Sequence, residues 1–213
     1  MGAVTAGEYL RDGAEIYRLS FATIRAETDL SRVPSDLEAA AVRMVHACGM
    51  VDLVDDLDWM PGVGGHIRRA LEGGAAILTD STMLADGIIR SRLPANNQVV
   101  CTLGDDGVPE RAVRMGTTRS AAAVDAWGDR LCSAVVAISN APTALFRLLE
   151  LLDEGSPSPA AIIGVPVGFV GAAESKRSLA RQAHGVPWLT VHGRRGGSAI
   201  AAGAVNALAS ERE

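Results

Sequence analysis

The sequence predicts an α/β fold, in which a mostly parallel five-stranded sheet has helices on both faces and is preceded by N-terminal helices. Short apolar runs alternate with helical patterns from Ala75 onward, and Gly, Pro, Asp or Asn bounds each run. Hydrophobic residues make up 48% of the chain but aromatic residues only 4%, so we expect an aliphatic core. The 213 residues suit a single domain over 1–213, with a helical N-terminal extension at about 8–48.

The N-terminal part contains two helical patterns, over 8–27 and 35–48. The second pattern is expected to open with a capping box from Ser35 to Glu38. The segment 59–74 then predicts a glycine-rich turn followed by a short helix. These elements are expected to cover the sheet or a partner subunit.

The main part of the chain alternates between strand and helix patterns. The expected strands are 75–79, 98–103, 134–139, 160–165 and 188–193. The expected helical segments are 81–93, 118–133, 142–154, 172–182 and 196–210. Strict alternation of this kind is typical of parallel strands joined by helical crossovers.

Charge, cysteine usage and hydropathy exclude several classes of protein. The net charge of −5 argues against a nucleic-acid partner or an anionic membrane surface. Cys48, Cys101 and Cys132 lie far apart in apolar surroundings, which is typical of small core residues in a reducing compartment. The sequence shows no export signal and no apolar span, so we expect a soluble, cytoplasmic protein. The histidines have no metal-ligand spacing, and no metal site is expected.

Glycine-rich turns after the strands are where a parallel sheet usually binds its ligand. Gly168 and Gly171 follow one strand and favour either an anion cradle or a tight structural turn. No dinucleotide fingerprint and no P-loop are present there, which disfavours a nucleotide-binding enzyme.

Arginines beside helix starts suit a ligand with carboxylates. Arg194 and Arg195 stand beside Gly197 and Ser198, and either carboxylate binding or an exposed surface turn fits this pattern. Thr118 can cap a helix whose first turn holds Arg119, a cation at the unfavourable end of the helix dipole. Such an arginine indicates a ligand anion or simple solvent exposure.

His46 lies near the end of an alanine-rich helical pattern. A lone histidine in such a place is more often a hydrogen-bonded core residue, but imidazole can also give or take a proton near neutral pH. The residues by themselves leave both roles open.

Seven segments of the chain resemble signature blocks of the precorrin-8X methylmutase family. They are 16–27 (IYRLSFATIRAE), 41–49 (AVRMVHACG), 77–88, 118–127 (TRSAAAVDAW), 140–150, 164–176 (GVPVGFVGAAESK) and 193–208. The similarity runs from about Arg11 to Ala209, and only the stretch 50–65 does not align. The resemblance implies a homodimeric isomerase of cobalamin biosynthesis that moves a methyl group from C-11 to C-12 of precorrin-8X. The product is hydrogenobyrinic acid, and no cofactor or external methyl donor is needed.

The resemblance also implies roles for particular residues. His46 takes the position of the family's motif histidine, which would sit against the macrocycle as a proton or hydrogen-bond donor. The residues expected to contact the substrate are Tyr17, Ser20, Arg25, Met83, Thr118, Arg119, Asn140, Gly168, Gly171, Ser175, Gly197 and Ser198. Among them, Arg25 and Arg119 are expected to pair with acetate or propionate arms. Two alternatives stay open: a cobalt-precorrin-8 methylmutase of the anaerobic pathway, and a non-catalytic tetrapyrrole carrier.

Overall fold

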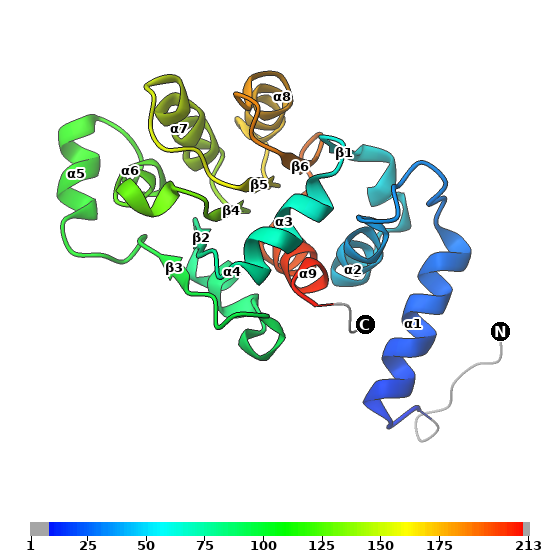
Figure 1. Ribbon diagram of the computed structural model, residues 1–213. Helices are drawn as coiled ribbons and strands as arrows, with labels where there is room; N and C mark the ends of the chain where they lie inside the picture. Colours follow the sequence, from blue (N-terminus) through cyan, green and yellow to red (C-terminus); the bar gives the residue numbers. More distant parts are fainter. Residues whose placement is uncertain (1–8, 211–213) are drawn as a thin grey trace.

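The computed structural model describes residues 9–210, which form a six-stranded sheet with helices on both faces (Figure 1). The strands are β1 (Leu57–Trp59), β2 (Ile77–Thr79), β3 (Val99–Cys101), β4 (Val135–Ile138), β5 (Ala161–Gly164) and β6 (Trp188–Val191). Their order across the sheet is β1-β6-β5-β4-β2-β3. The five strands β2 to β6 are parallel, whereas β1 pairs with β6 in the antiparallel sense.

The α-helices of residues 9–210 are α1 (Gly13–Glu27), α2 (Glu38–Cys48), α3 (Val63–Glu72), α4 (Thr82–Gly87), α5 (Val108–Met115), α6 (Arg119–Asp125), α7 (Pro142–Asp153), α8 (Ala172–Gln182) and α9 (Ser198–Leu208). Helices separate successive strands from β1 onward, with α1 and α2 before β1 and both α5 and α6 between β3 and β4. Short 3₁₀ segments occupy Val51–Asp56, Arg90–Arg92 and Gly128–Leu131. In the described part of the chain, no helix combines the length and the apolar character that crossing a membrane requires.

The prediction of an α/β sheet with helices on both faces is confirmed, but the prediction of five strands is wrong. Each of the five expected runs contains a strand, and β1 adds a sixth at the antiparallel edge. The strand β1 has three residues in a segment rich in aspartate, a residue that strands disfavour. Pairing of Leu57 with Val191 and of Trp59 with Leu189 makes it a strand, and that pairing is tertiary.

Two helix predictions also need correction. The expected capping box from Ser35 to Glu38 does not form, because α2 starts at Glu38 after an N-cap residue, Leu37, that is almost fully buried. The helix thus starts three residues later than predicted and without a side-chain cap. The helix α5 lies in a segment for which the sequence indicated no element, and the expected helix start at residue 8 lies outside the described residues.

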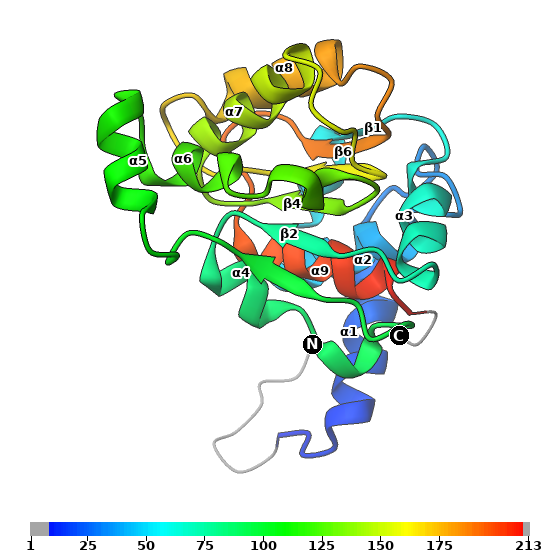
Figure 2. The same ribbon diagram turned by 60° about the vertical axis from the view of Figure 1, so that its left-hand side comes forward.

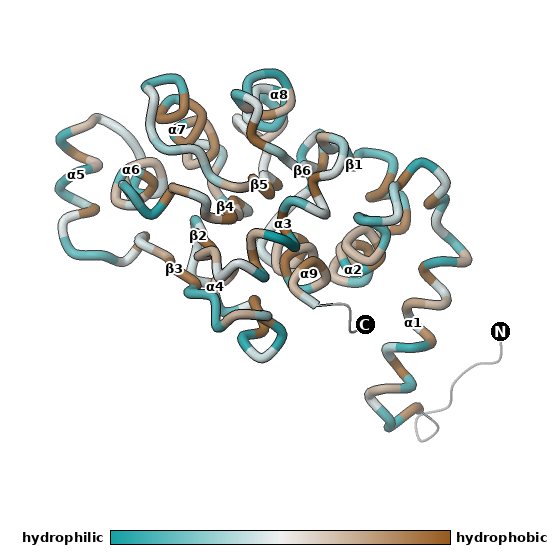
Figure 3. The backbone as a smooth tube through the Cα atoms, viewed as in Figure 1, coloured by the Kyte–Doolittle hydropathy of each residue, from teal (hydrophilic) through white to brown (hydrophobic). Residues whose placement is uncertain are grey.

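Alternating side chains of the strands face two separate cores, as the period of a strand requires. Ile77, Val135 and Ile163 pack on the face covered by α2, α3, α4 and α9. Leu78, Val136 and Ile162 pack on the opposite face under α6, α7 and α8. The central strands are the most hydrophobic stretches of the sheet (Figure 3), since both of their faces are buried.

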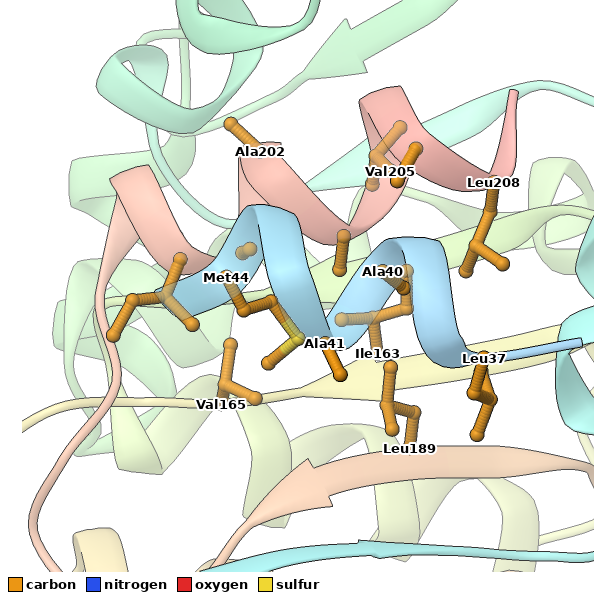
Figure 4. Packing of buried hydrophobic residues seen from close by; sticks show 14 of the residues in the cluster. Leu37, Ala40, Ala41, Met44, Ile163, Val165, Leu189, Ala202, Val205 and Leu208 are labelled. Atoms are coloured by element: carbon orange, nitrogen blue, oxygen red, sulfur yellow. The ribbon is translucent and has the colours of Figure 1, made fainter. Parts of the chain in front are cut away.

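The helices α2 and α9 pack closely and run antiparallel to each other (Figure 4). Gly203 of α9 permits this contact, because a Cβ atom there would lie 3.0 Å from the carbonyl oxygen of Arg43. The last turn of α2 therefore lies toward the start of α9. His46 and Ser198 are consequently at the same end of the domain.

The chain order of the strands creates a switch point between β2 and β4. From β2 the chain moves outward to β3, then returns to β4 on the other side of β2 and continues to β5 and β6. Figure 2 shows α4 beginning at the edge where β2 ends. In open parallel sheets, ligands bind beyond the carboxyl ends of the strands at such a point.

Candidate functional site

The switch point carries a group of polar side chains that we call the sheet-edge cluster: Asp80, Ser81, Ser139 and Ser198. Asp80 and Ser81 follow β2, Ser139 follows β4, and Ser198 begins α9. The Ser198 hydroxyl lies 3.2 Å from the Ser81 hydroxyl and 3.1 Å from the Ser139 hydroxyl. Three segments distant in sequence thus converge on one hydrogen-bonded group.

Asp80 is the anchor of this cluster. Its carboxylate accepts hydrogen bonds from the backbone N–H groups of Ser139 (2.9 Å), Asn140 (2.8 Å) and Ala141 (2.8 Å), and from the Ser139 hydroxyl (3.2 Å). The carboxylate is almost fully buried. A buried charge is tolerated when its hydrogen-bonding capacity is used, as it is here.

Glycines bring the loops after β5 and β6 together beside this cluster. A Cβ atom on Gly196 would lie 2.1 Å from the Val165 carbonyl oxygen, so only glycine fits. Gly197, with φ +118°, donates its N–H to that same oxygen at 3.0 Å. Gly168, with φ +148°, donates to the Arg194 carbonyl oxygen at 3.1 Å. The predicted glycine turns therefore fix the backbone around Ser198.

Large apolar side chains are exposed around the same edge. Phe169 and Val170 are 85% and 88% exposed in the loop after β5, and Met83 is 74% exposed in α4. The Arg194 guanidinium lies 5.2 Å from the centre of the Phe169 ring. Exposed apolar residues next to a hydrogen-bonded polar cluster such as the sheet-edge cluster are typical of a surface that contacts a ligand or a partner.

A second group lies between α1 and α2, and we call it the helix cluster: Tyr17, Ser20, Phe21 and His46. The Ser20 hydroxyl lies 2.8 Å from Nδ1 of His46. The rings of Tyr17 and Phe21 are each centred 5.2 Å from the imidazole. The fold thus brings together Tyr17, Ser20 and His46, three of the residues that the sequence analysis singled out.

The imidazole of His46 is biased toward its neutral form. Partial burial, and then the positive charge of Arg43, lower the pKa of His46 below its usual value of 6.5. It borders an open pocket of about 270 Å³, lined on the α1 side by Ser20, Thr23 and Glu27. A neutral ring with Nδ1 bound to Ser20 can serve through Nε2 as a hydrogen-bond donor or acceptor.

The four arginines singled out from the sequence differ in how they are placed. Arg25 pairs with Glu38 at 3.3 Å, and Arg195 pairs with Asp52 at 2.8 Å and also with Asp56. Arg119, in the first turn of α6, and Arg194 are exposed. Arg195 is engaged within the protein, which leaves Arg119 and Arg194 better placed to meet a carboxylate ligand.

Lys176 is a fully buried cation beneath the loop that leads to Ser198. Its Nζ donates to the Arg195 carbonyl oxygen at 2.7 Å. Burial lowers the pKa of Lys176 to about 8, although the nearby charge of Asp56 opposes this shift. Lys176 thus ties α8 to the loop that carries Arg195 and Gly197.

The remaining residues predicted to contact the substrate differ in exposure and in hydrogen-bond partners. Thr118 caps α6, and its hydroxyl lies 2.8 Å from the Thr143 hydroxyl. Asn140 is exposed beside the sheet-edge cluster, and Gly171, with φ +80°, precedes α8. Ser175 is fully buried and donates to the Ala172 carbonyl oxygen at 3.1 Å, so its hydroxyl serves its own helix and does not face the surface.

Sequence reasoning missed Asp80, Ser81 and Ser139. A signal was present for Asp80, which directly follows a predicted strand, and for Ser139, which ends one, so both belong to the edge where ligands bind. Ser81 begins a predicted helical segment, and short polar residues at such places also occur in ordinary turns and helix caps.

Comparison with known proteins matches this chain to one family. The model of the precorrin-8X methylmutase family matches residues 15–211. The chain is 62% identical to the precorrin-8X methylmutase of Pseudomonas aeruginosa over 97% of this chain and 99% of that one. It is 55% identical to the precorrin-8X methylmutase of a Sinorhizobium species, over 95% and 96% of the two chains.

A more distant sequence relative and a solved structure agree with this match. The cobalt-precorrin-8 methylmutase of Salmonella typhimurium is 39% identical, with 80% of each chain covered. The crystal structure of the Thermus thermophilus precorrin-8X methylmutase superimposes with a TM-score of 0.84 and 34% identity, over 92% of this chain and 94% of that one. The chain therefore belongs to the precorrin-8X methylmutase family.

Proposed function

We propose that this protein is an isomerase of cobalamin biosynthesis that moves a methyl group of precorrin-8X from C-11 to C-12 and so forms hydrogenobyrinic acid. The observation that carries the proposal is the near full-length similarity to two precorrin-8X methylmutases, at 62% and 55% identity. The site adds a neutral imidazole at an open pocket and a polar edge flanked by exposed apolar residues. A largely apolar, conjugated macrocycle with acidic arms needs surfaces of both kinds.

In this proposal His46 is the candidate catalytic residue. Ser20 holds Nδ1, which orients the ring and leaves Nε2 for the pigment. Because the pKa of His46 is lowered, the ring is neutral near pH 7 and acts mainly as a hydrogen-bond donor to a macrocycle nitrogen. Withdrawing electron density next to C-11 would favour migration of the methyl group, since charge that develops during the shift is stabilised.

The same proposal assigns the acidic arms of the substrate to exposed arginines. Arg119 in the first turn of α6 and Arg194 beside Phe169 point to this role, because both are exposed at the edge where the strands end. Thr118, Asn140 and the backbone at Gly168, Gly171 and Gly197 lie around the same edge. Guanidinium groups suit carboxylates because they can form two parallel hydrogen bonds.

We further propose that the active protein is a homodimer in which a second copy covers α1. Ile16, Tyr17 and Leu19 of α1 are exposed, and the helix lies at the margin of the molecule (Figure 1). The pocket at His46 has about 270 Å³, whereas pockets for drug-sized ligands typically measure about 300–1,000 Å³. One chain alone therefore does not enclose a macrocycle there, and an apolar helix face beside the pocket suits a partner subunit.

The alternative substrate is the cobalt-containing pigment. The relatives named for that substrate are less similar, at 39% identity for the Salmonella typhimurium enzyme. The decisive experiment is a single-turnover absorbance assay with precorrin-8X and, separately, with cobalt-precorrin-8. Conversion of the metal-free pigment at a rate at least tenfold higher supports the proposal, and the opposite preference contradicts it. Stoichiometric pigment binding without conversion of either compound would instead indicate a carrier.

A further inference from the structure

The hydroxyl groups of the sheet-edge cluster form a chain whose direction can be deduced. Each serine hydroxyl has one hydrogen to donate and two lone pairs to accept with. The Asp80 carboxylate only accepts, so the hydrogen of the Ser139 hydroxyl points to Asp80 at 3.2 Å. Ser139 then has no hydrogen left for Ser198.

The next two links follow from this first one. Ser198 and Ser139 are 3.1 Å apart, so Ser198 must donate its hydrogen to Ser139. Ser81 and Ser198 are 3.2 Å apart, so Ser81 must donate to Ser198. Ser81 in turn accepts from the backbone N–H of Leu84 at 3.3 Å. The order is Ser81 to Ser198 to Ser139 to Asp80, and all three hydroxyl hydrogens are used inside the protein.

Only Ser198 can present this chain to a ligand. Ser139 is fully buried and Ser81 nearly so, whereas Ser198 is half-buried at the start of α9. Its hydroxyl accepts from Ser81 and donates to Ser139, which leaves one lone pair. A carboxylate placed against that lone pair would be repelled, while a neutral donor would be bound.

We propose that Ser198 accepts a hydrogen bond from a neutral N–H or O–H group of the bound tetrapyrrole, rather than donating to one of its carboxylates. This inference rests on the proposed function for the identity of the ligand. It changes the expected role of Ser198, which the sequence placed among groups that attract carboxylates. Two parts of a metal-free pigment can supply the donor: a ring N–H, or a side-chain carboxyl that stays protonated.

The test is binding of hydrogenobyrinic acid, followed by absorbance, to the parent protein and to Ser198→Ala. Loss of one neutral hydrogen bond should weaken binding by about three- to tenfold. The factor should be the same at low and high salt, because no ionic charge is involved. An unchanged affinity, or a loss that shrinks as salt is added, would overturn the inference.

Two control variants separate loss of the hydroxyl from general damage. Ser198→Thr keeps a hydroxyl at the start of α9, and Ser35→Ala removes an exposed hydroxyl before α2. Both should bind the pigment within about twofold of the parent, since neither removes the proposed acceptor. If Ser198→Thr weakens binding as much as Ser198→Ala, the hydroxyl is not the group that binds and the inference fails.

Two further arms identify the donor. If the donor is a ring N–H, the loss of affinity caused by Ser198→Ala should stay constant from pH 6 to pH 8. That loss should disappear with the cobalt complex, because its ring nitrogens bind the metal. If it is a protonated carboxyl, the factor falls as pH rises and persists with cobalt. Both patterns support an accepting Ser198. If the parent protein converts precorrin-8X and Ser198→Ala binds the pigment as tightly as the parent, only this inference is refuted. If the parent protein binds no pigment, the proposed function is refuted.

Discussion

The sheet-edge cluster and the helix cluster differ in how completely one chain surrounds them. Asp80 and Ser139 are buried between three segments, and the Asp80 carboxylate accepts four hydrogen bonds. The His46 imidazole is hydrogen-bonded to Ser20 and borders an open pocket beside exposed residues of α1. The first cluster is therefore complete within one chain except at Ser198, while the second has an open side where a pigment and a partner subunit can be added.

The difference predicts that substitutions in the two clusters have different consequences. Changes at Asp80 or Ser139, the most buried members of the sheet-edge cluster, should appear mainly in folding stability, because these groups are already bonded in the free protein. Changes in the helix cluster should appear mainly in turnover and association. Substitutions at four positions test this contrast: Asp80 in the first cluster and Lys176 beneath the loop that leads to it, and His46 in the second cluster and Leu19 on the exposed face of α1.

The largest effect is expected for Asp80→Asn. The amide would place an NH₂ group against backbone N–H donors, and buried hydrogen bonds to a charged group are lost. We expect the free energy of unfolding in urea to fall by roughly 3–5 kcal/mol. Asp86→Asn, an exposed position in α4, is the matched control and should change stability by less than about 0.5 kcal/mol. Equal stabilities of the two variants would show that the Asp80 network does not anchor the edge.

Lys176→Met should alter how stability depends on pH. The pKa of Lys176 is lowered from 10.5 to about 8 in the folded protein, so the unfolded chain binds more protons between these values. The free energy of unfolding of the parent protein therefore rises as pH increases from about 8 toward 10.5, and this gain is lost again as pH falls back to about 8. Relative to Lys176→Met, the parent should gain about 2–3 kcal/mol between pH 7 and pH 10. Parallel pH curves for the two proteins would contradict a buried, shifted lysine.

His46→Ala should fold and bind pigment but lose about 10²-fold or more in the rate of methyl migration. His46→Asn sharpens the result, since its amide can donate a hydrogen bond but cannot supply a proton near neutral pH. Residual turnover by His46→Asn above that of His46→Ala would indicate polarisation by a hydrogen bond. Melting curves serve as the check, because a purely structural histidine would lower stability and leave the rate of the folded fraction unchanged.

The smallest effect concerns association through α1. Leu19→Glu places a charge on the exposed apolar face and should raise the dimer dissociation constant by about tenfold or more, which sedimentation can measure. Stability of the isolated chain should hardly change, since Leu19 is exposed. Val113→Glu, at an exposed apolar position of α5, is the matched control and should leave dimerisation intact. If both variants dimerise like the parent, α1 is not the interface.

The contrast also explains which site residues could be found from sequence. Tyr17 and Ser20 lie three residues apart on one helix, so helical spacing alone placed them side by side. His46 could be singled out only through its resemblance to the family motif, because the residues by themselves also fitted a core histidine. The rate of methyl migration in His46→Ala tests the catalytic role, because a core histidine would leave that rate unchanged in the folded fraction.

Local patterns in the sequence determined most of the architecture. The five apolar runs and the helices between them could be read because burial of both sheet faces imposes continuous apolar strands. Glycine turns near Gly168, Gly171 and Gly197 could be read for a similar reason, since a positive φ strongly favours glycine. Each of these signals is contained within a few consecutive residues.

Tertiary structure alone decided the sixth strand, the start of α2 and the sheet-edge cluster. The strand β1 exists because β6 pairs with it, and α2 starts at Glu38 after the core residue Leu37 and not at the local capping signal of Ser35. Ser81 and Ser198 are 117 positions apart, and Asp80 and Ser139 are 59 apart. No local pattern encodes such distant neighbours, because the order of the strands in the sheet brings them together. The direction of the hydroxyl chain, and with it the kind of group that Ser198 can bind, therefore appears only once the chain has folded.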